Sequence, residues 1–523
     1  MIHNLAIFLE SVAFIYLAYL LGILYFRLSG SKLESALKDA TYSVILGYGL
    51  WGILGFALAL AGLFEKTYLY ALALLILFLQ RKIIASQFGL LLEWKSFLSR
   101  IKLYTREIFS ENRYLKLLIV VWIFINFFIV FVPVTGYDTK AYHLPIISEM
   151  VAQGRVAFDP ASPFFNWRAI LVETIYAIPI VLFGDSLDPY VFQILQYSAL
   201  ILFLVLLYEF TKPFLKNRFF GIVPILFLLS TMDFQREIMH GGYIDVFVYL
   251  FGITSVLLVI ESCLSAEIQN KKLSLSAVLL GVALSSKSIA LFFALINGLF
   301  LTFLFVKNKL SFPRIAGYFM KYSAVALAIS GFWYVKNFFL YGNPVYPIFS
   351  MPEMQADIAR FIMERDFVNF LFFPFYRFGQ WFISDIESSS RLVVLAYFAL
   401  LYVLILFFIA RKRIVTVAEV LIFVFIEIYL LLSFYFSHEI RFMLPVLIMI
   451  PPLLAVLLDK LFIEIEIMFG QEFKNKAFRI FQGACVFAFT VLFLGNIHYF
   501  KVRFLYITSY YSKAEYVLNI GFQ

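Results

Sequence analysis

The chain has 523 residues, of which 63% are hydrophobic and only 14% charged, and its mean hydropathy is +0.91. About a quarter of the residues of a soluble domain are charged, so this composition excludes a soluble enzyme and predicts an all-α polytopic membrane protein. The net charge of +9 is typical of basic cytoplasmic loops that face anionic lipid. Membrane lipids are therefore expected partners, and nucleic acid is not.

Apolar stretches of the length that spans a bilayer, about 20 residues, predict about fourteen transmembrane helices. In chain order they lie at 5–26, 41–62, 68–85, 115–134, 190–211, 219–232, 243–262, 274–286, 288–306, 315–340, 391–410, 415–436, 441–459 and 479–497. The apolar stretch 169–184 is shorter and contains Glu173 and Pro179. We expect it to lie along the outer membrane interface instead of crossing.

Loop charges orient the predicted helices, because basic residues collect in cytoplasmic loops. The segment 81–113 carries seven Lys and Arg residues, and 307–314 and 411–413 are also basic. The two longest loops of the opposite set, 135–189 and 341–390, carry more acidic than basic residues. These two loops are predicted to be extracytoplasmic.

The first outer loop contains a polar motif at 136–145, Gly-Tyr-Asp-Thr-Lys-Ala-Tyr-His-Leu-Pro. Asp138 comes a few residues after a predicted span, where its carboxylate can take a proton from an attacking hydroxyl. Capping of the next helix is the alternative, because Asp is a favoured N-cap residue. Tyr142 follows Asp138 by about one helical turn, and Tyr137 and His143 are further candidates for binding substrate.

Two polar positions interrupt apolar stretches later in the chain. Asp245 enters the predicted span 243–262 near its outer end, where a lone carboxylate is costly to bury. A helix-start acid stabilised by the helix dipole is the alternative. Lys287 separates two short predicted helices and suits a phosphate oxygen, unless it snorkels to the interface. His240 is a further candidate for binding substrate.

Two other outer segments carry candidate substrate-binding residues. Lys336 lies near the end of the predicted span 315–340 and either binds phosphate or snorkels to the headgroups. The segment 437–441, Ser-His-Glu-Ile-Arg, contains His438, Glu439 and Arg441. The planar fork of an arginine pairs well with phosphate, whereas His438 is more simply explained as an interfacial histidine.

The order and spacing of these motifs resemble those of the C-type membrane glycosyltransferases (GT-C superfamily), and among them the bacterial protein O-mannosyltransferases and aminoarabinose transferases. The resemblance covers about 115–460. Its motifs are the acidic motif at 136–145, outer helices from 162 to 184, Gly-Tyr-x-Asp at 242–245, Ser-Lys-Ser at 286–288, Lys-Asn-x-x-x-x-Gly-Asn-Pro-Val-Tyr-Pro at 336–347 and Arg-Phe-Met-Leu-Pro at 441–445.

The resemblance implies a GT-C-like bundle of about fourteen transmembrane helices with outer juxtamembrane helices. Its catalytic membrane core would be 115–460, preceded by extra helices and a cytoplasmic amphipathic segment in 1–114 and followed by a helix and tail in 461–523. Many relatives carry a second acid directly after the first, where this chain has Thr139. Glu149, Glu237 or Asp245 can supply that acid.

The resemblance further implies a glycosyltransferase that moves a sugar from polyprenyl phosphate to a glycan, lipid or protein acceptor. The reaction would take place on the extracytoplasmic face of a bacterial inner membrane, with Asp138 as the base. No cofactor is expected; a divalent metal is compatible with the chemistry but not required by it. The alternatives are a transporter or lipid flippase, which explains the hydrophobicity equally well, and a polysaccharide polymerase or ligase.

Overall fold

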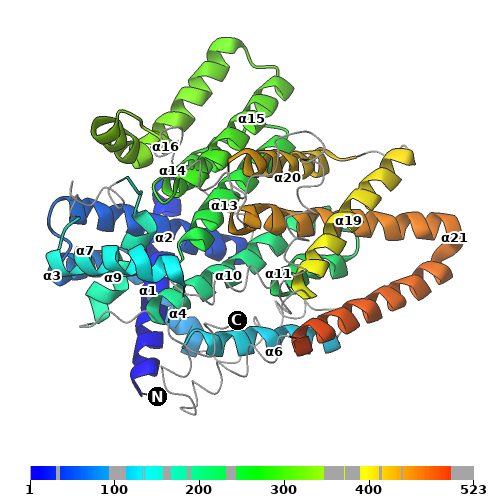
Figure 1. Ribbon diagram of the computed structural model, residues 1–523, viewed down its shortest axis with the longest axis horizontal. Coiled ribbons are helices and arrows are strands. Elements are labelled where there is room, and N and C mark those ends of the chain that lie inside the picture. Colours follow the sequence, from blue (N-terminus) through cyan, green and yellow to red (C-terminus); the bar gives the residue numbers. More distant parts are fainter. Residues whose placement is uncertain are drawn as a thin grey trace. The chain divides into compact units, whose positions relative to one another are not determined.

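The computed structural model describes residues 2–30, 36–92, 113–131, 134, 136–156, 167–184, 190–230, 243–346, 370, 389–411, 415–436 and 440–495. These residues form helices and turns, with no strand among them (Figure 1). The α-helices are α1 (Ile2–Leu28), α2 (Ala36–Leu60), α3 (Lys66–Leu79), α4 (Arg81–Leu92), α6 (Arg113–Ile129), α7 (Leu144–Gln153), α9 (Leu171–Phe183), α10 (Tyr190–Thr211), α11 (Val223–Ser230), α13 (Asp245–Leu264), α14 (Asn270–Leu284), α15 (Leu291–Lys307), α16 (Phe312–Tyr341), α19 (Ser389–Ala410), α20 (Val417–Phe436) and α21 (Leu444–Gly495). The predicted all-α class is thereby confirmed for the described residues.

Fewer helices are long enough to cross a membrane than the sequence predicts. Among the described residues eight helices are long and apolar enough, or nine if one bent pair forms a single span. The shorter apolar helices are Leu117–Phe127, Leu171–Phe183, Arg218–Leu229 and Phe398–Ala410. The count of about fourteen is not confirmed, because several apolar stretches form helices shorter than the roughly 20 residues that span a bilayer.

The predicted span 68–85 is broken in the structure. Helices α3 and α4 meet at a bend of 67°, and Gln80 lies at the break with no exposed surface. Its side chain accepts a hydrogen bond from Arg27 at 2.9 Å and donates one to the carbonyl of Leu20 at 3.3 Å. Both partners belong to α1, so the buried amide ties the break to that helix and satisfies its own polar atoms.

Helix α21 consists of two arms that meet at Gly470, whose backbone has φ 83° and ψ 168°. Glycine reaches positive φ without the steric cost that other residues meet. Figure 1 shows the sharp bend between the arms. Across it, the ring of Phe462 lies 5.5 Å from the rings of both Phe478 and Phe481. The chain reverses direction within the segment 460–479, which lies between two of the spans predicted from the sequence.

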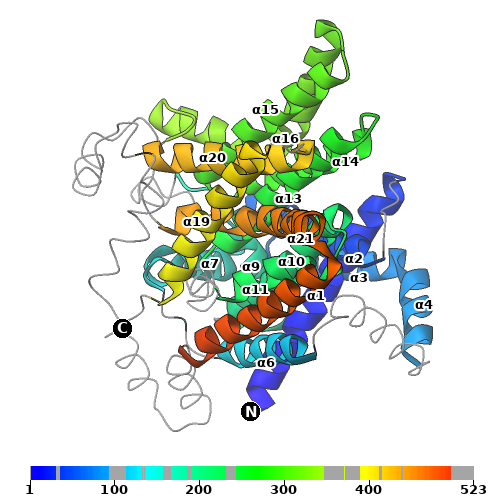
Figure 2. The ribbon, with the colours of Figure 1, turned by 90° about the vertical axis from the view of Figure 1, so that its right-hand side faces the viewer.

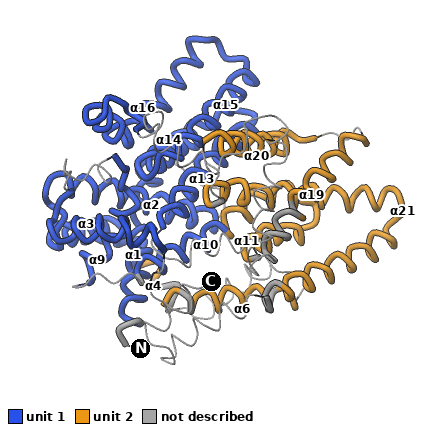
Figure 3. Tube along the Cα trace, in the orientation of Figure 1, with its two compact units in different colours: residues 1–84, 134–203, 240–364 blue, residues 85–133, 204–239, 365–523 orange. Residues whose placement is uncertain are grey.

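The chain forms two compact units, coloured in Figure 3. Unit 1 contains Met1–Ile84, Val134–Phe203 and His240–Glu364, and unit 2 contains Ala85–Pro133, Leu204–Met239 and Arg365–Gln523. In unit 1, α13 packs against α14 and α15, and α14 packs against α16. Helices α15 and α16 project together beyond the helices beside them (Figures 1 and 2). Nearly all of α13 is buried, so it forms the centre of this unit.

Helix α9 is enclosed by protein instead of lying on a surface. Its residues from Leu171 to Ile180 are all buried, and it packs against α1, α2, α3 and α7. An amphipathic surface helix keeps one face exposed, and α9 does not have such a face. Its predicted position along the outer membrane interface stays a prediction. Its length of 13 residues is nevertheless too short for a span.

The two ends of α13 carry different polar groups. Asp245 begins the helix, and near its other end Glu261 binds Lys38 and Lys272 at 2.8 Å each. Twenty helical residues rise about 30 Å, the thickness of the hydrocarbon core. The groups around Asp245 and those around Glu261 are therefore separated by about the thickness of the hydrocarbon core.

Candidate functional site

The acidic motif folds into a short π-helix, Thr139–His143, which continues directly into α7. Asp138 precedes it with helical backbone angles, and its side chain makes no capping hydrogen bond. The side chain is half-buried. The structure thus does not support capping as the use of this carboxylate, and π-helical turns are frequent at functional sites.

Tyr142 is the first partner of Asp138 in this motif. Its hydroxyl donates a hydrogen bond to the Asp138 carboxylate and accepts one from Arg168. The Arg168 guanidinium also lies over the Tyr142 ring, 3.4 Å from its centroid. Burial is the main cause that raises the pKa of Tyr142, with Asp138 acting in the same direction and Arg168 opposing it. The phenol is therefore a neutral donor placed between a carboxylate and a guanidinium.

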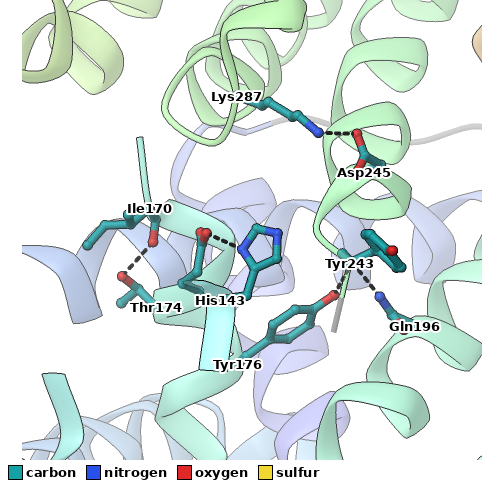
Figure 4. Close-up of polar contacts among 9 residues, drawn as sticks. His143, Ile170, Thr174, Tyr176, Gln196, Tyr243, Asp245 and Lys287 are labelled. Atoms are coloured by element: carbon teal, nitrogen blue, oxygen red, sulfur yellow. Dashed lines mark hydrogen bonds and ion pairs between the residues drawn. The ribbon is translucent and has the colours of Figure 1, made fainter. Parts of the chain in front are cut away.

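His143, the next residue, is paired with an acid from α9. Its Nδ1 lies 2.7 Å from Oε1 of Glu173, and the two side chains are 2% and 1% exposed. Figure 4 marks this contact with a dashed line from His143. Tyr176 follows Glu173 by about one helical turn on α9. A buried acid without a partner would be costly, so this contact explains why α9 tolerates a carboxylate.

A backbone carbonyl connects α9 and α10 to the start of α13. The carbonyl of Tyr243 accepts hydrogen bonds from the hydroxyl of Tyr176, at 3.0 Å, and from the amide of Gln196 (Figure 4). The ring of Tyr243 also packs against Gly136, where an added Cβ would lie 2.6 Å from Cε2 of that ring. The motifs at 136–145 and 242–245, distant in sequence, are thereby brought into contact.

Asp245, the first residue of α13, is fully buried and bound to Lys287. Its Oδ1 lies 2.6 Å from Nζ of Lys287 and 3.3 Å from the hydroxyl of Tyr249. The backbone N–H of Leu171 donates to the carbonyl of Ser285, two residues before the lysine, at 3.1 Å. The two charges that the sequence marks separately, as a possible acid and a phosphate-binding cation, therefore neutralise each other.

The remaining candidates of unit 1 lie at different depths. Lys336 is half-buried and lies over the ring of Trp333, 4.7 Å from its centroid. The next residue, Asn337, donates to the carbonyl of Trp167 at 3.1 Å, which joins the end of α16 to the residue before Arg168. Tyr137 is 80% exposed. Glu149 is exposed on α7 and accepts a hydrogen bond from Gln153, one turn later, at 3.0 Å.

Four further candidates complete the set. Arg441 belongs to unit 2, where it is half-buried and its guanidinium lies 5.1 Å from the ring of Phe442. His240, His438 and Glu439 lie outside the described residues.

Sequence reasoning missed three residues of the site, Arg168, Glu173 and Tyr176. The sequence did contain a signal for Glu173, because a lone acid in an apolar stretch is costly to bury and is often functional. Arg168 directly precedes that stretch, but its stacking on Tyr142 depends on how the outer segment folds back. Tyr176 is one of 32 tyrosines, and its sequence surroundings do not distinguish it.

Two buried acids near the site already have nitrogen partners. Asp245 binds Lys287, and Glu173 binds His143. Within the described ranges no group of three or more His, Cys, Asp or Glu side chains could hold a metal. Cys263 and Cys485 are both free thiols.

Comparison with models of protein families, with curated proteins and with solved structures finds no match for this chain.

Proposed function

We propose that this membrane protein is a glycosyltransferase of the C type, which transfers a sugar from a polyprenyl phosphate to an acceptor hydroxyl. The observation that carries the proposal is the arrangement around Asp138. This carboxylate makes no capping hydrogen bond and accepts from the buried phenol of Tyr142, and the guanidinium of Arg168 lies over the ring of the same tyrosine. A base next to a cation is the pair of groups that this transfer needs.

In the proposed reaction the acceptor hydroxyl attacks the anomeric carbon while Asp138 takes its proton. The bond between the anomeric carbon and the phosphate oxygen breaks, and the electron pair leaves with the polyprenyl phosphate. Arg168 would stabilise the charge on that leaving group, because its fork of N–H donors matches phosphate geometry. Arg168 suits this role better than Lys287, whose charge is already paired with Asp245.

The second acid of the proposed site is best assigned to Asp245, which would act as a fixed charge. It is 1% exposed and bound to Lys287, and its helix start is held by the contacts of Tyr243. Glu149 is less suitable because it is exposed and pairs with Gln153 on its own helix. We therefore expect Asp245 to influence the site through Lys287 and Tyr249, without taking the proton itself.

The test compares Asp138→Asn with wild type in lipid nanodiscs, using a panel of polyprenyl-phosphate sugars with candidate acceptors. Release of polyprenyl phosphate and donor binding are measured separately by lipid mass spectrometry and by titration. Asparagine keeps the size of the side chain but removes the base, so transfer should fall by about 100-fold or more. Donor binding and expression should stay near wild type.

The matched control for this test is Glu267→Gln, an exposed acid in the loop between α13 and α14. It should transfer sugar as wild type does. Glu149→Gln is a third arm, because this acid is the competing candidate from the sequence. A rate of sugar transfer by Asp138→Asn within a few-fold of wild type would show that Asp138 is not the base. Movement of the lipid across the bilayer by wild type, without sugar transfer from any donor, would favour a flippase.

A further inference from the structure

Glu173 is a buried acid within the site that the proposed reaction does not use. Its carboxylate is 1% exposed and lies 2.7 Å from Nδ1 of His143. When Glu173 is ionised, its carboxylate only accepts hydrogen bonds, so the Nδ1 of His143 then carries the proton in this contact. The acid therefore determines which nitrogen of the imidazole is protonated.

His143 in turn contacts the residue that carries the proposed chemistry. Its ring centroid lies 4.2 Å from that of Tyr142. The Tyr142 ring supports the guanidinium of Arg168 at 3.4 Å, and its hydroxyl binds Asp138. A continuous series of contacts thus leads from Glu173 through His143 and Tyr142 to the proposed cation and the proposed base.

The contact between Glu173 and His143 leaves one polar atom of each side chain without a hydrogen bond among the described residues. Oε2 of Glu173 and Nε2 of His143 are both buried and have no hydrogen-bond partner among the described residues. The second ring nitrogen of His143 faces away from the carboxylate (Figure 4). Most buried polar atoms in proteins are bonded, and the exceptions are frequent where a site has a function beyond stability.

We propose that Glu173 is a positioning residue of the site, which acts through His143 on the ring of Tyr142. By holding the imidazole in one tautomer and one orientation, it fixes the surface against which the Tyr142 ring packs. That ring determines how far the Arg168 guanidinium lies from the Asp138 carboxylate. The inference rests on the proposed function, because the reaction that this spacing serves is the transfer of sugar from a lipid phosphate.

The test uses Glu173→Gln in the full-length protein. Glutamine has the same size, but its amide can donate to Nδ1, so the imidazole is no longer held in one tautomer. We expect kcat to fall about 10–100-fold, the range found when the carboxylate partner of a metal-binding histidine is removed, with a smaller change in KM. The ¹⁵N spectrum of histidine-labelled protein should show His143 with altered protonation. The chain contains five histidines, and the His143→Asn variant identifies the signal.

The matched control is Thr174→Val, at the next residue of α9. Thr174 is also fully buried, and its hydroxyl donates to the carbonyl of Ile170 at 3.0 Å. This variant should lose stability while keeping the wild-type kcat and the His143 signal. A wild-type kcat and an unchanged His143 signal in Glu173→Gln would overturn the inference. A loss of activity in both variants that follows only their folded fractions would do the same.

A separate measurement distinguishes this inference from the proposed function. Binding of a short-chain prenyl phosphate without sugar reports the position of Arg168 and needs no catalysis. Glu173→Gln should weaken this binding severalfold, and Thr174→Val should not. If wild type transfers no sugar, the proposed function fails, while the histidine signal and the binding result still decide whether Glu173 positions the site. Unchanged binding and an unchanged histidine signal would reject that role by themselves.

Discussion

At the scale of single residues, the surroundings of Asp138 distinguish between two common uses of a carboxylate after an apolar helix. A capping Asp accepts a hydrogen bond from the first backbone N–H groups of its helix, and Asp138 makes no such bond. Its contact with Tyr142 could be predicted, since residues four apart share one face of a helix. The contact with Arg168 could not, because no local periodicity relates the two segments.

The hydroxyl of Tyr142 provides the first residue-scale prediction. Tyr142→Phe keeps the ring that supports Arg168 and removes the donor to Asp138. We expect donor binding to stay near wild type and kcat to fall about tenfold, the loss of one hydrogen bond to a charged group. Steady-state kinetics and donor titration measure the two effects, with Tyr68→Phe on α3 as the control. An unchanged kcat would show that this hydroxyl does not matter for transfer.

The same phenol has a predictable pH dependence. Burial raises the pKa of Tyr142 above its ordinary value of 10.0, so the neutral, donating form persists at all lower pH values. The wild type should therefore lose no activity through this group up to about pH 10. Wild type and Tyr142→Phe should show the same alkaline limb in their pH–rate profiles. A limb below that pH in wild type alone would mean that the phenol ionises more easily than its burial implies.

At the scale of elements, the site depends on the contact between the acidic motif and the start of α13. Gly136 allows this contact, because the Tyr243 ring occupies the space where a side chain would begin. The carbonyl of Tyr243 is held by α9 and α10 through Tyr176 and Gln196. Only the ring can therefore move to relieve a clash, and the backbone before Asp245 is fixed.

Gly136→Ala is the prediction at this scale. An added Cβ would lie 2.6 Å from Cε2 of Tyr243 and 3.0 Å from the hydroxyl of Thr139, so it should destabilise unit 1 by about 1–3 kcal/mol. Chemical unfolding in detergent and sugar transfer measure the effect. Gly298→Ala on α15, where a Cβ meets nothing within 4 Å, should be neutral or slightly stabilising.

A second substitution identifies the cause of that effect. Tyr243→Leu removes the ring atoms that the new methyl group would meet, so the double variant should recover part of the lost stability relative to Gly136→Ala. Equal stability of Gly136→Ala and wild type would show that the contact between the two motifs is loose.

At the scale of the whole molecule, α13 separates two chemically different ends of unit 1. Asp245 and its partners lie at the start of the helix, and the Lys38–Glu261–Lys272 cluster lies near its end. Lysines concentrate on the cytoplasmic side of membrane proteins. From this charge distribution we expect the proposed site on the extracytoplasmic side, which stays a prediction.

Cysteine labelling tests this orientation in a variant that lacks Cys263 and Cys485. A cysteine at Glu149, exposed on α7, should react with a membrane-impermeant maleimide in intact cells. A cysteine at Glu267, exposed after α13, should react only after the cells are opened. The reverse pattern would place the site on the cytoplasmic face. It would also exclude a lipid-linked donor in the outer leaflet as the substrate. Labelling of both positions in intact cells would show that the cells are leaky.

The sequence by itself determined the class of the protein and the positions of its polar motifs. A chain that is 63% hydrophobic must form helices in a membrane, because each helix satisfies its own backbone hydrogen bonds there. Asp138, Asp245 and Lys287 were visible as polar breaks in apolar sequence. These inferences need only composition and local order.

Only the tertiary structure decided which of these groups meet and what they do to one another. Asp245 and Lys287 form one neutral pair, Arg168 stacks on Tyr142, and Glu173 holds His143. It also decided which apolar stretches are long enough to span and that α9 is enclosed by protein. The physical reason is that each contact joins residues from different helices. Its formation depends on how helices pack, bend and end, which hydrophobicity along the chain does not record.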